Sequence, residues 1–430
     1  MDVLGVSESE LTYQAISSDK LYECKFIQNS EACNNSTLLF NCKGCSYCFG
    51  CVGLRNKQYH IFNKPYSKEN YTKKLEELGI GSYKNLEQAK KEFEKTKLQF
   101  PHKFARMSNS QDSTEDNLFY VNNSKFCFDV KKETEDSKFI VNGVGPIKDL
   151  YDGYGVGATA ELLYEVTDSG DQGTKNLFAV FTWGSTNTTY TYGCHGSKNC
   201  FGCVSIRSKE YCILNKQYSK EEYEELVPKI ITHMNKMPYK GNNKKEYKYG
   251  EFFPIEISPF AYNETVAQEY EPLTKNEAEK KGYTWKEEEK KNYGITKHTK
   301  DLPDNINEIK EDILGEVIEC EHKGECKEKC TTAFKITKEE LQLYKKLGIP
   351  LPRLCSNCRH FARVRLVGLP KLHHRKCHCA GESSENNVYK NTTNHSHHDK
   401  EHCPNEFETT YAPDRPETIY CEACYQQEVN

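Results

Sequence analysis

Short runs of apolar and aromatic residues alternate with Asn, Ser, Lys and Gly through the first half of the chain. Between residues 20 and 65 these runs are LYECKFI, STLLFNC, YCFGCVGL and QYHIF. Between residues 118 and 215 the same rhythm returns, from NLFYVNN to KEYCILN. Each run is too short for a helix and is bounded by turn-forming residues, which predicts β-strands.

The even spacing of the runs is typical of the coils of a β-solenoid or of a β-meander. We expect a mainly β fold and favour the solenoid, because its coils stack aromatic and cysteine side chains in ladders. Such ladders need little apolar core per residue, in agreement with a hydrophobic content of 36%. An ordinary antiparallel sandwich is the alternative, since periodicity alone does not separate the two.

The chain contains an internal repeat. Residues 41–71 and 193–223 align without a gap and agree at 18 of 31 positions. Agreement over this length predicts two copies of one structural unit. The matched pairs include Cys42/Cys194, Cys48/Cys200, Cys51/Cys203 and Arg55/Arg207.

A helix is predicted after each copy, flanking the strands. Ser219 and Glu222 form a capping-box sequence, and the apolar residues that follow share one helical face. After the first copy, a helix is expected to end at Gly79, with a second helix around residues 84–98. One more amphipathic helix is expected within residues 303–319.

Composition narrows the class of protein. The net charge of −4 creates no overall field that would attract a polyanion. The N-terminus lacks a secretory signal and no run approaches the length of a membrane span, so we expect a cytoplasmic protein without a membrane partner. In that compartment, 21 cysteines predict reduced thiols and metal sites rather than disulfides.

Two cysteine pairs predict a zinc ribbon, because each tight turn presents two thiolates to one ion. The helix expected between the pairs ends at Gly348. Cys320 and His322 are close enough in sequence to replace Cys326 as a ligand. The predicted ligands are Cys326, Cys330, Cys355 and Cys358.

A second zinc ribbon is predicted from five cysteines that compete for four places. Cys421-x2-Cys424 is the secure pair, and Cys403 with one of two remaining cysteines completes the set. Residues 381–402 are polar and rich in histidine, and we expect them to form a disordered loop rather than to bind metal. The candidates are Cys377, Cys379, Cys403, Cys421 and Cys424.

Residues 353–376 contain seven Lys or Arg residues and no Asp or Glu. In an acidic chain such a local excess is typical of a surface that contacts a phosphate backbone. A solvated charged face is the alternative. The candidate nucleic-acid-binding residues are Arg353, Arg359, Arg363, Arg365, Lys371, Arg375 and Lys376.

The repeat cysteines allow three interpretations, of which we favour packing as small apolar side chains in a ladder. An iron–sulfur cluster would use the run from Cys42 to Cys51, but its last gap is one residue short of a ferredoxin run and Cys45 becomes Ser197 in the second copy. A zinc site in each copy is the third interpretation. Its ligands would be Cys42, Cys48, Cys51 and His60, and then Cys194, Cys200, Cys203 and Cys212.

No catalytic motif stands out, since the sequence lacks the Walker A, H-E-x-x-H and G-x-S-x-G patterns. We therefore predict a non-enzymatic protein that binds Zn²⁺ and, through the basic segment, RNA or DNA. A structural or protein-interaction scaffold is the alternative, and an iron–sulfur or hydrolytic enzyme is a distant third. The expected parts are a first repeat with a helical insertion at 1–100, a β-repeat domain at 101–235, a linker at 236–319 and a small α+β double zinc-ribbon module at 320–430.

Five segments, CFGCVGLRNKQY, CFGCVSIRSKEYCILNKQYSKEEYEELVPKII, YGEFFPIEISPFAYNETVAQEY, LPRLCSNCRH and CPNEFETTYAPDRPETIYCEACYQQEV, carry a resemblance. They resemble a family of uncharacterised cysteine-repeat proteins that bear the label "Caib/baif family". That label is shared with CoA-transferases, and the likeness implies no activity. The stretch KCTTAFKITKEELQLYKKLGIPLPRLCSNCR is similar to the probable zinc-ribbon domains of small bacterial proteins, which implies ligand roles for Cys326, Cys330, Cys355 and Cys358.

Overall fold

The chain divides into two compact units in a computed structural model. One unit contains residues 1–104, 289–368 and 373–430, and the other contains residues 105–288 and 369–372. The structure describes residues 1–157, 159–287, 293–326 and 328–429. Among these residues, no helix combines the length and the apolar character that crossing a bilayer requires.

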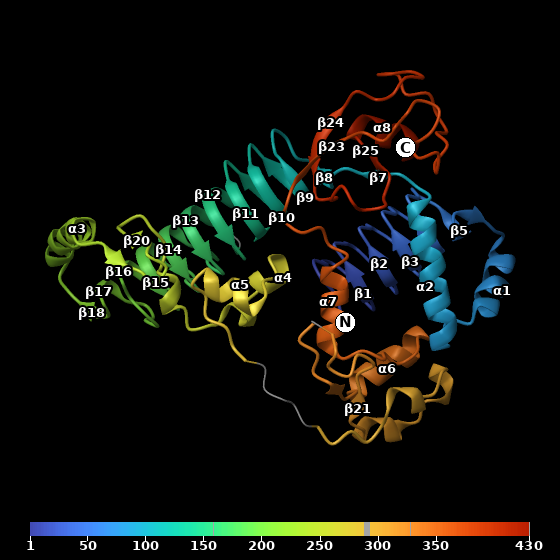
Figure 1. Cartoon of the computed structure of the whole chain (residues 1–430), viewed down its shortest axis with the longest axis horizontal. Helices are drawn as coiled ribbons and strands as arrows, with labels where there is room; N and C mark the ends of the chain where they lie inside the picture. The colour runs from blue at the N-terminus through green and yellow to red at the C-terminus, as the bar shows by residue number, and fades with distance from the viewer. Residues whose placement is uncertain (158, 288–292, 327, 430) are drawn as a thin grey trace. The chain divides into compact units, whose positions relative to one another are not determined.

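Most of the regular structure is β-sheet, as predicted (Figure 1). The first unit holds a six-stranded sheet of β1 (Tyr13–Ile16), β2 (Lys25–Gln28), β3 (Thr37–Phe40), β4 (Ser46–Val52), β5 (Gln58–Ile61) and β6 (Lys64–Pro65). The second unit holds an eleven-stranded sheet of β8 (Met107–Ser108), β9 (Glu115–Asn122), β10 (Lys125–Glu135), β11 (Lys138–Val144), β12 (Ile147–Tyr154), β13 (Ala160–Thr167), β14 (Thr174–Val180), β15 (Thr186–Tyr192), β16 (Lys198–Phe201), β17 (Glu210–Ile213) and β18 (Lys216–Gln217).

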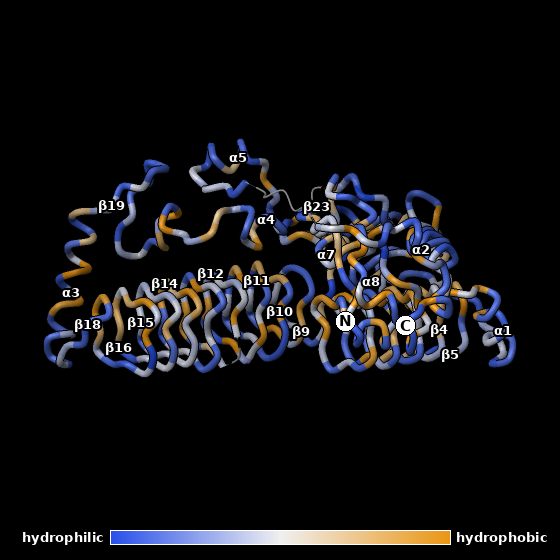
Figure 2. The backbone as a smooth tube through the Cα atoms, turned by 90° about the horizontal axis from the view of Figure 1, so that it is seen from below, coloured by the Kyte–Doolittle hydropathy of each residue, from blue (hydrophilic) through white to orange (hydrophobic). Residues whose placement is uncertain are grey.

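Strands that follow one another in the chain are neighbours in each sheet, and they pair in parallel until a short hairpin closes the series at β6 and at β18. The antiparallel sandwich is therefore wrong for these strands. Figure 2 shows the backbone of β9 to β16 as a series of similar turns, with hydrophobic and hydrophilic positions alternating along each turn.

The turns of the first unit repeat every twelve residues. Tyr13 pairs with Lys25, and Lys25 pairs with Thr37 in the next strand. From Gly5 to Phe62 every third residue has a left-handed φ, between 44° and 69°. The residue after each of these corners points inward and is buried throughout the span 15–51. Each twelve-residue turn thus has four inward positions, which small or apolar side chains fill.

The predicted helices flank the strands. α1 (Lys68–Leu78) ends at Gly79, whose φ of 54° forms the left-handed cap, and α2 (Tyr83–Leu98) follows. α3 (Lys220–Lys236) begins at the capping box of Ser219 and Glu222. Leu86 and Phe93 of α2 pack against Phe26 and Phe49 in the main core of the first unit.

The C-terminal segment of the first unit is built from short elements. α6 (Lys338–Leu347) ends at Gly348 as predicted, and its Tyr344 packs edge-on against Tyr13 with ring centroids 5.5 Å apart. The other elements there are α7 (Ser356–Val364), α8 (Glu422–Val429), the strand pairs β7 (His102–Lys103) with β25 (Ile419–Tyr420), β21 (Ile318–Glu319) with β22 (Ala333–Phe334), and β23 (His373–Lys376) with β24 (Glu406–Thr409).

The helix predicted within residues 303–319 does not form. The segment instead contains the 3-10 turns η4 (Ile306–Glu308) and η5 (Glu311–Gly315) before β21. Ile306 and Ile313 are buried in the main core, so each turn contributes one anchor to that core instead of a continuous helical face. In the second unit, residues 239–280 contain β19 (Tyr239–Lys240), β20 (Glu246–Tyr247), α4 (Ala267–Tyr270) and α5 (Lys275–Lys280).

Candidate metal centres

Four cysteines of the first unit bring their sulfur atoms within 4.8 Å of one another: Cys320, Cys330, Cys355 and Cys358. The Sγ–Sγ distances are 3.9 Å for Cys320 and Cys358, 3.9 Å for Cys330 and Cys355, and 3.5 Å for Cys355 and Cys358. A Zn²⁺ ion with Zn–S bonds of about 2.3 Å needs sulfur atoms about 3.8 Å apart in a tetrahedron. The cluster could therefore hold one metal ion, and none of the 21 cysteines is in a disulfide.

Backbone elements hold these sulfur atoms in place. Cys355 is the N-cap of α7 and Cys358 lies in its first turn, so two thiols converge at one helix start. The backbone N–H of Cys355 donates to Cys320 Sγ at 3.3 Å, and that of Thr332 donates to Cys330 Sγ at 3.3 Å. A hydrogen bond from Cys320 lowers the pKa of the Cys355 thiol to about 3, which favours the thiolate that a metal ion binds.

Cys326, a predicted ligand, is not in this group of four. Its Sγ lies 3.6 Å from Cys358 Sγ, but it belongs to a separate set of possible donors with His322 and Glu328. Cys320 takes its place because β21 leads straight into it and its backbone N–H donates to the carbonyl of Thr332 at 2.8 Å. Cys320 is fully buried, whereas Cys326 is partly exposed.

A second cluster gathers four of the five predicted cysteines: Cys377, Cys403, Cys421 and Cys424, again within 4.8 Å of one another. The sulfur atoms of Cys403 and Cys421 are 3.8 Å apart. Cys421 precedes α8 and Cys424 lies in its first turn, as in the first cluster. Hydrogen bonding from Cys377 lowers the pKa of Cys421, so this cluster also favours a thiolate.

The prediction of a disordered loop at residues 381–402 is wrong. Asn391 donates to the carbonyl of Gly381 at 2.6 Å and to Cys379 Sγ at 3.1 Å, and Ser384 exchanges hydrogen bonds with the backbone of Tyr389. His395 of this segment is fully buried. Composition suggested solvated side chains, but many of these polar groups bond to the segment itself.

The repeat cysteines are not brought together as ligands. Cys42, Cys45, Cys48 and Cys51 are the four inward positions of one twelve-residue turn, which explains their spacing of three residues. The S–H groups donate to backbone carbonyls, for example Cys42 to Cys51 at 3.5 Å and Cys194 to Cys203 at 3.3 Å. In the part of the chain that the structure describes, the groups of three or more convergent metal donors include no repeat cysteine. This arrangement favours packing over zinc or iron–sulfur binding.

Three of the seven candidate nucleic-acid-binding residues are buried, with exposed fractions of 6–7%: Arg353, Arg359 and Arg363. Arg353 donates to the carbonyls of Leu302 and Pro303, and Arg359 Nε donates to Asp2 Oδ2 at 2.6 Å.

The other four residues are more accessible, but three have partners. Arg365 forms an ion pair with Glu328, and Lys376 Nζ lies 2.9 Å from Glu406 Oε1. Arg375 donates to the carbonyl of Ala412 at 3.0 Å, and Lys371 is exposed.

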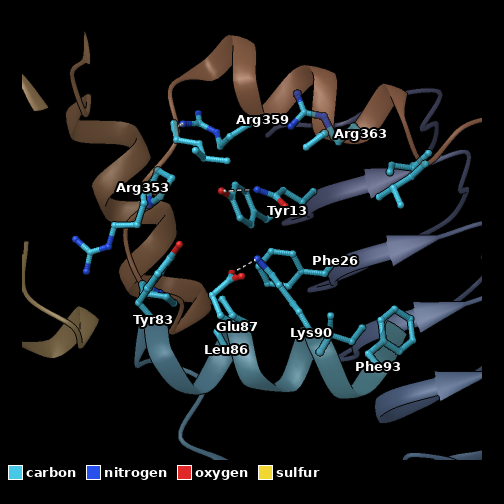
Figure 3. Close-up of a pocket in the computed structure, with 18 of the residues that line it drawn as sticks. Tyr13, Phe26, Tyr83, Leu86, Glu87, Lys90, Phe93, Arg353, Arg359 and Arg363 are labelled. Carbon is cyan, nitrogen blue, oxygen red and sulfur yellow. Dashed lines mark hydrogen bonds and ion pairs between the residues drawn. The ribbon is translucent and has the colours of Figure 1, made fainter. Parts of the chain in front are cut away.

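A cavity of about 330 Å³ lies in the first unit beside these arginines, next to β1–β3 and α2 (Figure 3). Tyr13 and Phe26 face α2 across it, while the guanidinium of Arg353 points away. Lys90 pairs with Glu87 at 2.8 Å and Arg359 pairs with Asp2, so two of the cations that line it are already neutralised.

In comparisons with known proteins, no family model matches the sequence and no curated protein matches it.

Proposed function

We propose that this chain is a non-enzymatic scaffold in which two zinc–thiolate centres fix the C-terminal segment to a β-solenoid. The observation that carries the proposal is the convergence of four cysteine sulfur atoms in each of two places, at tetrahedral spacing. Four protein ligands fill the coordination of Zn²⁺ and leave no open position for a substrate. Closed sites of this kind stabilise folds and do not catalyse reactions.

The donor set favours Zn²⁺ among the common metal ions. Thiolate sulfur is a soft ligand that selects zinc, copper(I) or iron–sulfur clusters over magnesium and calcium. A single ion with four thiolates in a tetrahedron is the usual form of a structural zinc site.

The β-solenoid is supported by the twelve-residue offset of the parallel strands. Parallel bridges recur at four places in each turn, for example between Ser7 and Asp19 and between Glu10 and Tyr22. The regular left-handed residue at every third position gives each turn four similar corners. Each coil of this kind contacts only the neighbouring coils and buries a narrow column of small side chains. Stacked coils therefore form a rigid support against which other segments can pack.

The second centre is attached to the first repeat through a short chain of side chains. Arg55 donates to the carbonyl of Asn41, and Asn41 donates to the hydroxyl of Tyr425 in α8. Tyr425 follows the ligand Cys424 directly and is almost fully buried. These hydrogen bonds therefore join the first repeat to α8 beside the second metal centre, which fits a structural role.

The scaffold is favoured over the nucleic-acid-binding protein because Arg353, Arg359 and Arg363 are buried, the first two with internal hydrogen-bond partners. A phosphate backbone needs accessible guanidinium groups. Binding of RNA or DNA would have to use Arg365, Lys371 and Lys376, of which two already pair with carboxylates.

The test is metal analysis of the purified full-length chain, combined with thermal unfolding before and after exhaustive chelation. We expect bound zinc and a marked fall in the melting temperature after its removal, because zinc binding to such sites contributes directly to the folding free energy. A chain that contains no metal, or that melts at the same temperature without it, contradicts the proposal. Salt-sensitive retention on heparin that is lost on charge reversal of Arg365 and Lys371 would favour the nucleic-acid-binding protein instead.

A further inference from the structure

We propose that the second thiolate centre holds two zinc ions that share the thiolate of Cys424. The inference rests on the proposed function, which requires a metal at this centre, and adds a second site to it. The first ion would be bound by Cys377, Cys403, Cys421 and Cys424, and the second by Cys379, His395, His398 and Cys424.

The second donor set has the spacing of a tetrahedral site. Cys379 Sγ lies 3.2 Å from His395 Nδ1, His395 Nδ1 lies 3.2 Å from His398 Nε2, and His398 Nε2 lies 3.3 Å from Cys424 Sγ. Zn–N bonds of about 2.0 Å and Zn–S bonds of about 2.3 Å place neighbouring donors about 3.3–3.5 Å apart. These atoms are therefore arranged around a point that one ion can occupy.

The histidine tautomers point to a cation at that place. His395 Nε2 lies 2.8 Å from Glu428 Oε1 and can only donate to this carboxylate, so Nδ1 of the neutral ring carries a lone pair. His398 Nδ1 lies 2.8 Å from the carbonyl of Glu401 and must donate to it, so Nε2 also carries a lone pair. Two acceptor nitrogens 3.2 Å apart repel each other unless a positive ion lies between them.

Glu428 has the place of the second-layer carboxylate that orients a metal-bound histidine. Its side chain and that of His395 are both fully excluded from solvent. Glu428 Oε2 accepts hydrogen bonds from the hydroxyl of Tyr389 at 2.8 Å and from the backbone N–H of Thr392 at 2.9 Å. The carboxylate is thus fixed by other groups and holds the imidazole ring of His395 in one orientation.

His397 supports the shared thiolate without being needed as a ligand. Gln427 Nε2 donates to the carbonyl of Ala423 at 3.0 Å, which identifies it as the amide nitrogen, and it also faces His397 Nδ1 at 3.4 Å. The proton of His397 therefore lies on Nε2, which is 3.4 Å from Cys424 Sγ and 3.5 Å from Cys403 Sγ. A donor at this position stabilises a bridging sulfur.

Charge balance also favours two ions over one. One Zn²⁺ with four thiolates leaves two net negative charges in a buried site, with the thiol of Cys379 and two histidines unused. Two Zn²⁺ with five thiolates and two neutral imidazoles leave one net negative charge. A smaller uncompensated charge costs less in a buried environment.

The experiment counts zinc on the full-length chain by native mass spectrometry and elemental analysis. We expect three zinc ions per chain, one at the Cys320 centre and two at the Cys424 centre. A count of two contradicts the shared site and leaves the proposed function intact, whereas a chain without zinc contradicts both.

Variants locate the third ion. His395→Ala and Cys379→Ser should each lower the count from three to two, and Cys424→Ser should lower it to one. His402→Ala is the matched control, because His402 lies in the same segment but outside the donor sets, and it should keep three. Glu428→Gln keeps all ligands and should release one of the three ions to a chelator about 10–100-fold more readily. Equal zinc counts in wild type, His395→Ala and Cys379→Ser overturn the inference, even if one of these variants is less stable.

Discussion

Asp2 accepts a hydrogen bond from Arg359 at 2.6 Å across 357 residues of sequence, and both side chains are largely buried. Arg363 Nη1 lies 3.9 Å from the same carboxylate oxygen. One carboxylate near the N-terminus thus compensates two arginines of α7. These two basic residues of the segment 353–376 therefore stabilise the first unit. Their interaction with Asp2 fixes α7, the helix that begins after Cys355.

Removing Asp2 should destabilise the first unit strongly. Asp2→Ala leaves the guanidinium of Arg359 buried without its closest carboxylate, and we expect a loss of about 3–5 kcal/mol in the free energy of unfolding. The double variant Asp2→Ala/Arg359→Met should lose less than Asp2→Ala alone, because only Arg363, and no longer Arg359, is then left without the carboxylate. Urea unfolding followed by circular dichroism measures both. Lys43→Ala, which breaks an exposed ion pair with Glu31, is the control and should cost about 1 kcal/mol or less.

The identity of the fourth ligand in the first centre can be tested directly. Cys320→Ser should remove one zinc ion per chain, because its sulfur belongs to the tetrahedral group. Cys326→Ser should leave the zinc count unchanged, since Cys326 lies outside the group of four convergent sulfur atoms. Elemental analysis of the two variants beside the wild type decides the matter. The reverse pattern would restore the ligand set expected from the sequence.

The repeat cysteines should behave as packing residues. Cys48→Ala and Cys200→Ala each remove a fully buried sulfur from the inner column, and we expect a loss of about 1–3 kcal/mol in stability. Neither variant should change the zinc content, because neither residue belongs to a group of convergent donors. A fall in bound zinc in either variant would show that the repeats are metal sites after all.

The strands and most helices were predictable because their signals are local. Ser219 and Glu222 mark the start of one helix, and Gly348 marks the end of another, so one or two residues are enough to locate each. Short aromatic runs between turn-forming residues mark the strands. The finer period of three residues was missed. The sequence indicates this period at Asn29, Asn41 and similar Asn or Gly positions. These residues tolerate the left-handed conformation of the corner that precedes an inward residue. Because of that period, four cysteines at intervals of three residues fill the interior of one turn. Their spacing alone suggested a metal cluster.

The candidate metal centres were predictable in part. Paired cysteines at helix starts predict a turn that binds metal from the sequence alone. The choice of Cys320 over Cys326, however, depends on the pairing of β21 with β22. The role of His395 could not be read from composition, because a polar segment is buried only when its own hydrogen bonds and Glu428 compensate its side chains. Likewise Arg359 looked accessible because its partner, Asp2, lies at the other end of the sequence.

The stability of the first unit should fall as the solution is acidified, because His102 is buried in its neutral form. Burial lowers the pKa of His102 to about 4; nearby Glu417 raises it, while Lys97 and Arg415 lower it. The ring lies 3.0 Å from the carbonyl of Lys97 and 3.3 Å from the hydroxyl of Tyr411. In the unfolded chain the pKa is about 6.5, so between these values the unfolded state binds more protons than the folded state.

Because the unfolded state binds the additional proton, acidification destabilises the folded state. The contribution of His102 is fully present above pH 6.5, is lost as the pH falls toward 4, and amounts to about 3 kcal/mol. His102→Gln has no proton to gain, so its stability should depend less on pH by that amount. Urea midpoints of wild type and variant at several values between pH 7 and pH 4 measure the difference, and acid release of zinc affects both proteins alike and cancels. Parallel curves for the two proteins would mean that His102 does not contribute to the acid sensitivity.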